Sequence, residues 1–197
     1  MTRSVYVTGI DRGDGRQVVE LGVMELLTRQ VDRVGVFRPL VHHQPDRLFE
    51  LLRARYRLSQ DPATVYGMDY HEASALQAER GADELVSTLV DRFHVVARDY
   101  DVVLVLGTDF ADTQLPDELS LNARLANEFG AAVIPVVGGR GQPCESVLAE
   151  TRNAYRAYDG LGCDVLAMVT NRVAREDREE IAQRLTTRLP VPCYVVP

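Results

Sequence analysis

The chain has 197 residues, 46% of them hydrophobic and 26% charged, which is the balance of one globular domain with a sizeable core. Its net charge of −7 disfavours nonspecific binding to nucleic acid or to anionic membrane surfaces, and no apolar run approaches membrane-spanning length. Cys144, Cys163 and Cys193 are odd in number and lack metal-ligand spacing, so we expect reduced thiols in a cytoplasmic protein.

Continuous apolar runs alternate along the chain with amphipathic stretches. The runs that predict strands buried on both faces lie at 4–8, 33–37, 101–106, 131–137, 164–169 and 192–196. The stretches with helical periodicity lie at 16–30, 46–57, 71–98, 117–129, 143–158 and 175–188. We expect segment 58–70 to be a loop between helices. The alternation predicts a doubly wound α/β fold, in which helices flank a mainly parallel sheet and strands 4–8 and 101–106 are central and adjacent.

The first predicted strand runs into a glycine-rich turn, and a helix follows. Gly9, Gly13 and Gly15 have the character of a phosphate-binding loop, whose backbone N–H groups hold an anion at a helix N-terminus. A working loop of this kind places Lys and then Ser or Thr directly after its last glycine. Arg16 and Gln17 occupy those two positions here. The pattern indicates a nucleotide-binding shape without the side chains for hydrolysis, or a tight turn that binds nothing.

The charged side chains of this turn leave two interpretations open. Asp11 and Asp14 would repel a phosphate group, whereas Arg12 and Arg16 would offset that repulsion. Arg16 either grips an anion with its planar guanidinium or pairs with Asp14 and fills the pocket itself.

Three further positions follow other predicted strands. Phosphoryl transfer with Mg²⁺ needs a carboxylate at the end of the 101–106 strand, where Leu106 stands, and Asp109 either substitutes for it or caps a turn. Arg38 is either a second cation for the site or one half of a surface salt bridge. Asn171 either contacts a base edge or is a turn residue. The sequence indicates no catalytic residue, metal or cofactor.

The turn and these positions together resemble dethiobiotin synthetase. Thr8, Gly9, Asp11 and Gly15 match that family's loop, Thr-Gly-x-Asp-x-x-x-Gly-Lys-Thr, up to its Lys and Thr. The other matches to that family are Arg38-Pro39 in place of its Lys-Pro pair, Leu106 in its Val-Glu-Gly position and Asn171-Arg172 for its adenine-side Asn-Arg pair.

A closer resemblance is to the N-terminal domain of long-form bacterial phosphate acetyltransferase, itself a dethiobiotin-synthetase-like module. Its matches lie at 34–39, 103–110, 116, 118–123 and 194–197, and the similarity covers almost the whole chain. The resemblance implies that residues 1–197 are one P-loop-related domain at the N-terminal end of a longer polypeptide. The last residues, a bare strand that ends at Pro197, fit this expectation.

The resemblance also implies a function and partners. The domain would be a non-catalytic regulatory and assembly part of an enzyme that interconverts acetyl-CoA plus phosphate with acetyl phosphate plus CoA. Its partners would be the downstream domains, further copies in a homo-oligomer and a small-molecule effector, with no nucleic acid and no membrane. Two alternatives stay open, namely an ATP-dependent ligase of the dethiobiotin synthetase type and a free-standing interaction module.

Overall fold

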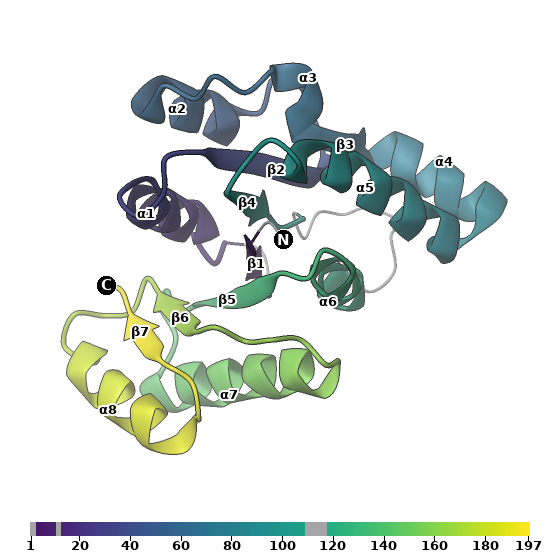
Figure 1. The fold of residues 1–197 in the computed structure, drawn as a ribbon. Coiled ribbons are helices and arrows are strands. Elements are labelled where there is room, and N and C mark those ends of the chain that lie inside the picture. The colour runs from purple at the N-terminus through teal and green to yellow at the C-terminus, as the bar shows by residue number, and fades with distance from the viewer. Residues whose placement is uncertain (1–2, 11–12, 109–117) are drawn as a thin grey trace.

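The computed structural model describes residues 3–10, 13–108 and 118–197. Its centre is a sheet in the order β3-β2-β4-β1-β5-β6-β7, in which every pair of neighbouring strands is parallel (Figure 1). Strand β1 (Arg3–Gly9) lies beside β4 (Val102–Leu106) in the middle of the sheet. The doubly wound fold and the central pair that the sequence predicts are therefore confirmed.

The other elements alternate as strand and helix. The remaining strands are β2 (Val34–Val41), β3 (Tyr66–Asp69), β5 (Ala132–Gly138), β6 (Met168–Asn171) and β7 (Cys193–Val195). The helices are α1 (Arg16–Thr28), α2 (Arg47–Tyr56), α3 (Pro62–Val65), α4 (Tyr70–Arg80), α5 (Ala82–Ala97), α6 (Glu118–Glu128), α7 (Cys144–Gly160) and α8 (Arg178–Arg188).

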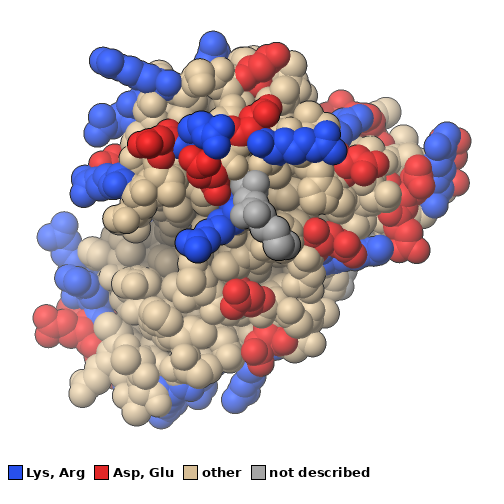
Figure 2. Space-filling model, viewed as in Figure 1, with Lys and Arg blue, Asp and Glu red and all other residues tan. Residues whose placement is uncertain are grey.

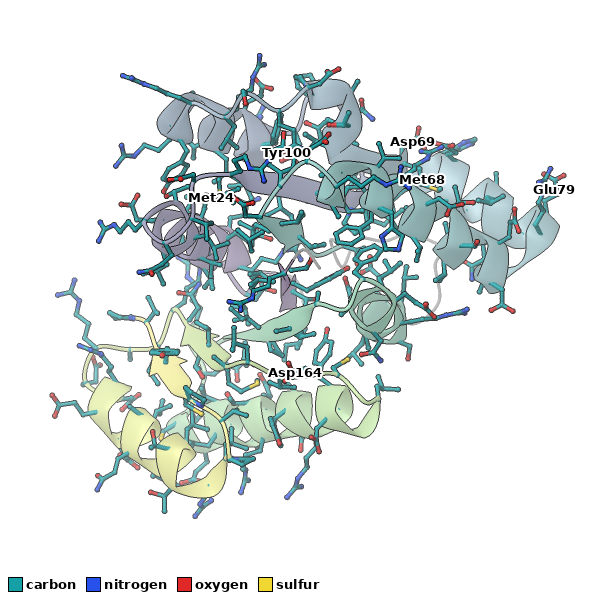
Figure 3. The ribbon with its side chains drawn as sticks, viewed as in Figure 1. Met24, Met68, Asp69, Glu79, Tyr100 and Asp164 are labelled. Carbon is teal, nitrogen blue, oxygen red and sulfur yellow. The ribbon has the colours of Figure 1, made fainter. Side chains whose placement is uncertain are left out.

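Helices cover both faces of the sheet. Successive residues of each strand point to opposite faces, so an apolar strand contributes to a core on each side. Val7 packs in one core with Met24 of α1 and Phe49 of α2. Its neighbour Tyr6 packs in a second core with Phe93 of α5 on the other face. Figure 1 shows α1 and α2 on one side of the sheet and α5, α6 and α7 on the other, and Figure 3 shows Met24 on α1. No helix in the described part of the chain is both long and apolar enough to cross a membrane.

Two predictions for the region 58–98 are wrong. The expected loop at 58–70 contains helix α3 and strand β3, which pairs with β2 through Arg38 opposite Tyr66. The expected helix at 71–98 is two helices, because Gly81 between them has a φ of 89° that ends the helical path.

Two strand boundaries also differ from the prediction. Strand β2 continues to Val41, so Arg38 lies within the strand and not after it. Strand β6 begins at Met168 and ends on Asn171, while the earlier residue Val165 makes a single bridge to Val133. Asn171 is therefore the last residue of a strand and lies at the carboxyl edge of the sheet, where sites gather in open α/β folds.

Candidate functional site

The glycine-rich turn joins the end of β1 to the start of α1 and folds back on itself. Gly15 precedes the helix with a φ of 73°, which suits glycine. Asp14 is turned inward, is 4% exposed, and its Oδ1 accepts a hydrogen bond of 2.9 Å from the backbone N–H of Arg16. A Cβ atom on Gly9 would lie 1.7 Å from Asp14 Oδ2. Glycine at position 9 therefore leaves the room that the Asp14 carboxylate occupies.

The Arg16 side chain also points into the turn and is buried. Its Nη1 donates a hydrogen bond of 2.7 Å to the backbone carbonyl of Thr108, which follows β4. Its Nε lies 3.4 Å from Oε1 of Glu20, one helical turn further along α1 and 1% exposed. Gln17, by contrast, is exposed on the first turn of α1. The turn is thus built around a buried guanidinium among buried carboxylates.

These contacts can be compared with what a nucleotide's phosphate groups need. A phosphate-binding loop offers free backbone N–H groups, a lysine and a metal-holding hydroxyl. Here the Asp14 carboxylate accepts a hydrogen bond from the first N–H of α1. Carboxylate oxygens are anionic acceptors like those of phosphate, so Asp14 takes a contact that a phosphate oxygen would make. The chain contains no lysine at any position, and Leu106 is fully buried at the end of β4. The described residues of the turn therefore lack the lysine and the metal-holding hydroxyl of such a loop, and a carboxylate accepts from the first N–H of α1.

Asn171 and Arg172 hold the outer side of the same turn. The Nδ2 of Asn171 donates to the carbonyls of Asp14 at 2.9 Å and of Gly15 at 3.0 Å. Arg172, with a φ of 60°, donates from Nη1 to the carbonyl of Gly13 at 2.7 Å. The structure thus brings Gly9, Gly13, Gly15, Arg16 and Asn171 together at one turn. The Asn171 amide therefore donates to the backbone of the turn itself. No pattern in the sequence predicts this contact.

Arg38 is neither a surface residue nor the end of a strand. It is 3% exposed, and its Nη1 lies 2.8 Å from Oδ2 of Asp46. The other carboxylate oxygen of Asp46 accepts from the backbone N–H of Phe49 at 3.0 Å and caps α2. The salt-bridge interpretation of Arg38 therefore needs one correction, because the ion pair is buried and anchors the start of a helix. Its role as a second cation for a ligand stays a prediction.

A buried polar network that sequence reasoning missed lies beside the turn. Asn122 of α6 is fully buried, and its Oδ1 accepts from the Tyr6 hydroxyl at 2.7 Å and from the Thr108 N–H at 3.0 Å. Its Nδ2 donates to Thr108 Oγ1 and to the Glu118 carbonyl, both at 2.8 Å. Burial raises the pKa of Tyr6 well above its ordinary value, so this phenol stays a hydrogen-bond donor. The network fixes Thr108, whose carbonyl holds Arg16.

We expect Asn122→Ala to destabilise the fold by about 2 kcal/mol, because the Tyr6 hydroxyl and the Thr108 N–H would lose their acceptor inside the protein. Urea unfolding measures this free energy. Asn127→Ala on the same helix is the matched control, since Asn127 makes an exposed bond of 3.0 Å to the Leu161 carbonyl. Equal costs for the two substitutions would contradict the role given to the network.

Two predicted site residues, Asp11 and Asp109, lie outside the described residues. Their proposed parts in an anion or metal site therefore stay predictions. Ligand binding by the other residues of this turn also stays a prediction.

Comparisons with known proteins agree on the family and the fold. Residues 3–195 match the model of the family described as AAA domain. The phosphate acetyltransferase of Synechocystis sp. is 26% identical over 192 residues, which are 95% of this chain and 28% of that protein. The phosphate acetyltransferase of Nitratidesulfovibrio vulgaris is 28% identical over 207 residues, with 100% of this chain and 29% of that protein covered. The chain therefore spans less than a third of these relatives, and the resemblance found in the sequence is confirmed.

A solved structure shares the fold at low identity. The signal recognition particle receptor FtsY from Elizabethkingia anophelis, determined in complex with GDP, has a TM-score of 0.59 and 14% identity. The match covers 99% of this chain and 57% of that one. At this identity it bears on the fold alone.

Proposed function

We propose, from the premise that the chain belongs to the AAA domain family, that it is a non-catalytic regulatory and assembly domain of a phosphate acetyltransferase. The similarity to two phosphate acetyltransferases, of which it covers 28% and 29%, supports a domain within a longer enzyme. The parent reaction would be acetyl-CoA plus phosphate to acetyl phosphate plus CoA. Downstream domains, further copies and a small-molecule effector are the partners of this proposal, and the cytoplasm is its location.

The observation that carries the non-catalytic part is the position of the Asp14 carboxylate. It accepts the backbone N–H of Arg16 and lies against Gly9, in the turn that would otherwise cradle phosphate. Binding a nucleotide there would require this buried carboxylate to leave, or a second anion to enter beside it. Both events carry a large electrostatic cost in a site of low dielectric constant.

The same geometry disfavours the ligase alternative. A ligase of the dethiobiotin synthetase type needs ATP, and the side chains that would hold its phosphate groups and metal ion are absent at positions 16, 17 and 106. The Asn171 amide, which that family uses on adenine, donates here to the carbonyls of Asp14 and Gly15. The free-standing interaction module differs from the leading proposal only in lacking a covalently attached acetyltransferase domain.

The test is turnover by the purified chain. We expect no release of phosphate from ATP and Mg²⁺ above the buffer rate, because neither the lysine nor the metal-holding side chains are present. A phosphate-release assay measures this, with the Gly15→Val variant beside it to identify a contaminating enzyme. Turnover that the chain shows and the variant lacks would contradict the proposal.

A second assay addresses the parent reaction. We expect the chain to release no CoA from acetyl-CoA and phosphate by itself. Turnover above buffer in this assay would show that the chain carries an acetyl-transfer site and that the assignment as a non-catalytic domain is wrong.

A further inference from the structure

Strand β2 has a strand beside it on both edges only along its second half. Strand β4 pairs with residues 34–37 of β2, and β3 pairs on the opposite edge with residues 38–41. On the β3 side, the first half of β2 therefore lies next to no strand of the described part of the chain. This gap lies at the amino end of the strands. The glycine-rich turn follows the carboxyl end of β1, so it lies at the opposite end of the parallel sheet.

The side chain of Gln60 fills half of this gap. It is 3% exposed, its Oε1 accepts from the backbone N–H of Val36 at 2.8 Å, and its Nε2 donates to the Val36 carbonyl at 2.8 Å. A carboxamide thus takes the place of a strand residue, because it holds one donor and one acceptor in one plane. Backbone groups of alternate residues in a strand point to the same edge, so those of Val34 are directed to the same side as those of Val36.

Val34 lines a cavity of about 400 Å³, a volume in the range of small-molecule sites. Apolar surface in this cavity comes from Leu58, Val31 and the Tyr100 ring. The ring lies against the backbone of β2, since a Cβ atom on Gly35 would be 2.6 Å from it, and Figure 3 shows Tyr100 close to β2. The cavity thus combines apolar walls with the backbone donor and acceptor of Val34.

The rim of the cavity carries charges of both signs. Arg33 is paired, with its Nη2 2.7 Å from Oδ1 of Asp101. Asp32, Asp99 and Arg57 are exposed and also line the cavity, and none of the three forms a salt bridge with a described residue. Figure 2 shows basic and acidic side chains next to one another on the surface over β2 and α2. A ligand here meets a guanidinium and two carboxylates.

We propose that this cavity binds a free amino acid whose side chain is a carboxamide, glutamine or asparagine. The ligand's carboxamide pairs with the backbone N–H and carbonyl of Val34, as the carboxamide of Gln60 does two residues further along β2. Its carboxylate pairs with Arg57, and its ammonium group with Asp32 and Asp99. This inference rests on the small-molecule effector of the proposed function and states its chemical class.

The helices around the cavity favour a ligand with an ammonium group over a purely anionic one. Thr28 and Tyr56 line the cavity, and they are the last residues of α1 and α2. A helix C-terminus carries partial negative charge, which stabilises a cation and repels an anion such as phosphate. Arg57 still offers one place for a carboxylate, so a zwitterion uses every charge that the cavity presents.

The test is a titration of the ¹⁵N-labelled chain with L-glutamine and L-asparagine, followed by two-dimensional NMR of the backbone amides. We expect a saturable shift of the Val34 amide with a dissociation constant of about 1 mM or below for at least one of them. L-methionine has a side chain of similar length without the amide, so it should bind at least about 10-fold more weakly than glutamine. The same spectra report whether each protein is folded.

Variants of α2 and its C-cap test the charged contact. Arg57→Gln should weaken binding of the amino acid at least about 10-fold, because its carboxylate loses a charge-assisted partner. Arg53→Gln is the matched control, since Arg53 is an exposed arginine on α2 that does not line the cavity, and its affinity should stay that of wild type.

Three results would overturn the inference. The first is the absence of a saturable shift with both amino acids up to about 10 mM. The second is equal affinity for methionine, which would show that Val34 does not recognise the carboxamide. The third is a set of shifts centred on Gly13 and Gly15, which would place binding at the turn. None of these results bears on the ATP or CoA assays, so the proposed absence of catalysis is judged separately.

Discussion

Replacing Arg16 with alanine is expected to destabilise the fold by about 3–5 kcal/mol at neutral pH, the range for breaking a buried ion pair by removing one partner. The guanidinium lies 3.4 Å from Glu20 and donates to the Thr108 carbonyl at 2.7 Å. Its loss leaves Glu20 and Asp14 buried, at 1% and 4% exposed, with less positive charge beside them. Urea unfolding of wild type and variant measures the difference.

Arg29→Ala is the control on the same helix. Arg29 also pairs with a glutamate one turn away, with its Nη2 2.8 Å from Glu25 Oε1, but its side chain is 68% exposed. Exposed pairs of this kind contribute little, because water already solvates both charges. We therefore expect the control to unfold close to wild type. An Arg16→Ala variant that behaves like the control would show that the buried guanidinium does not hold the turn.

The sequence predicts the frame of the fold well, because two-sided apolar strands and amphipathic helices leave clear periodicities. Strand β3 is missed for a physical reason. It is four residues long, contains Gly67, and follows a polar stretch with Pro62, so its own residues favour a loop. It forms because β2 offers an edge to pair with, which is a tertiary contact that no local pattern reports.

The candidate site shows the same division between local and distant signals. The spacing of Gly9, Gly15 and Arg16 is local, and it correctly predicts a P-loop-like turn. That Asn171 donates to the carbonyl of Asp14, across 157 positions, cannot be read from either residue. The buried partner of Arg38 had a faint signal, since Asp46 directly precedes a helical stretch, as an N-cap residue does.

The paired carboxylate at the start of α2 provides the other large prediction. Asp46→Ala should destabilise the fold by about 3–5 kcal/mol, because the buried guanidinium of Arg38 loses its carboxylate partner. The lost helix cap at the Phe49 N–H should add about 1 kcal/mol. Asp46 is itself only 16% exposed at its side chain, so little water screens the pair. Equilibrium unfolding in urea measures the sum.

Asp69→Ala separates the two contributions, because Asp69 caps α4 in the same way, by accepting from the Glu72 N–H at 2.7 Å, but lies exposed at the end of β3 (Figure 3). We expect about 1 kcal/mol for this control. The double variant Arg38→Met, Asp46→Ala should be more stable than Asp46→Ala alone, because it removes the buried guanidinium together with its carboxylate partner and keeps an apolar side chain in its place. If Asp46→Ala costs no more than Asp69→Ala, the pair with Arg38 contributes nothing, and a role for Arg38 in ligand binding becomes the better explanation of a buried arginine at this position.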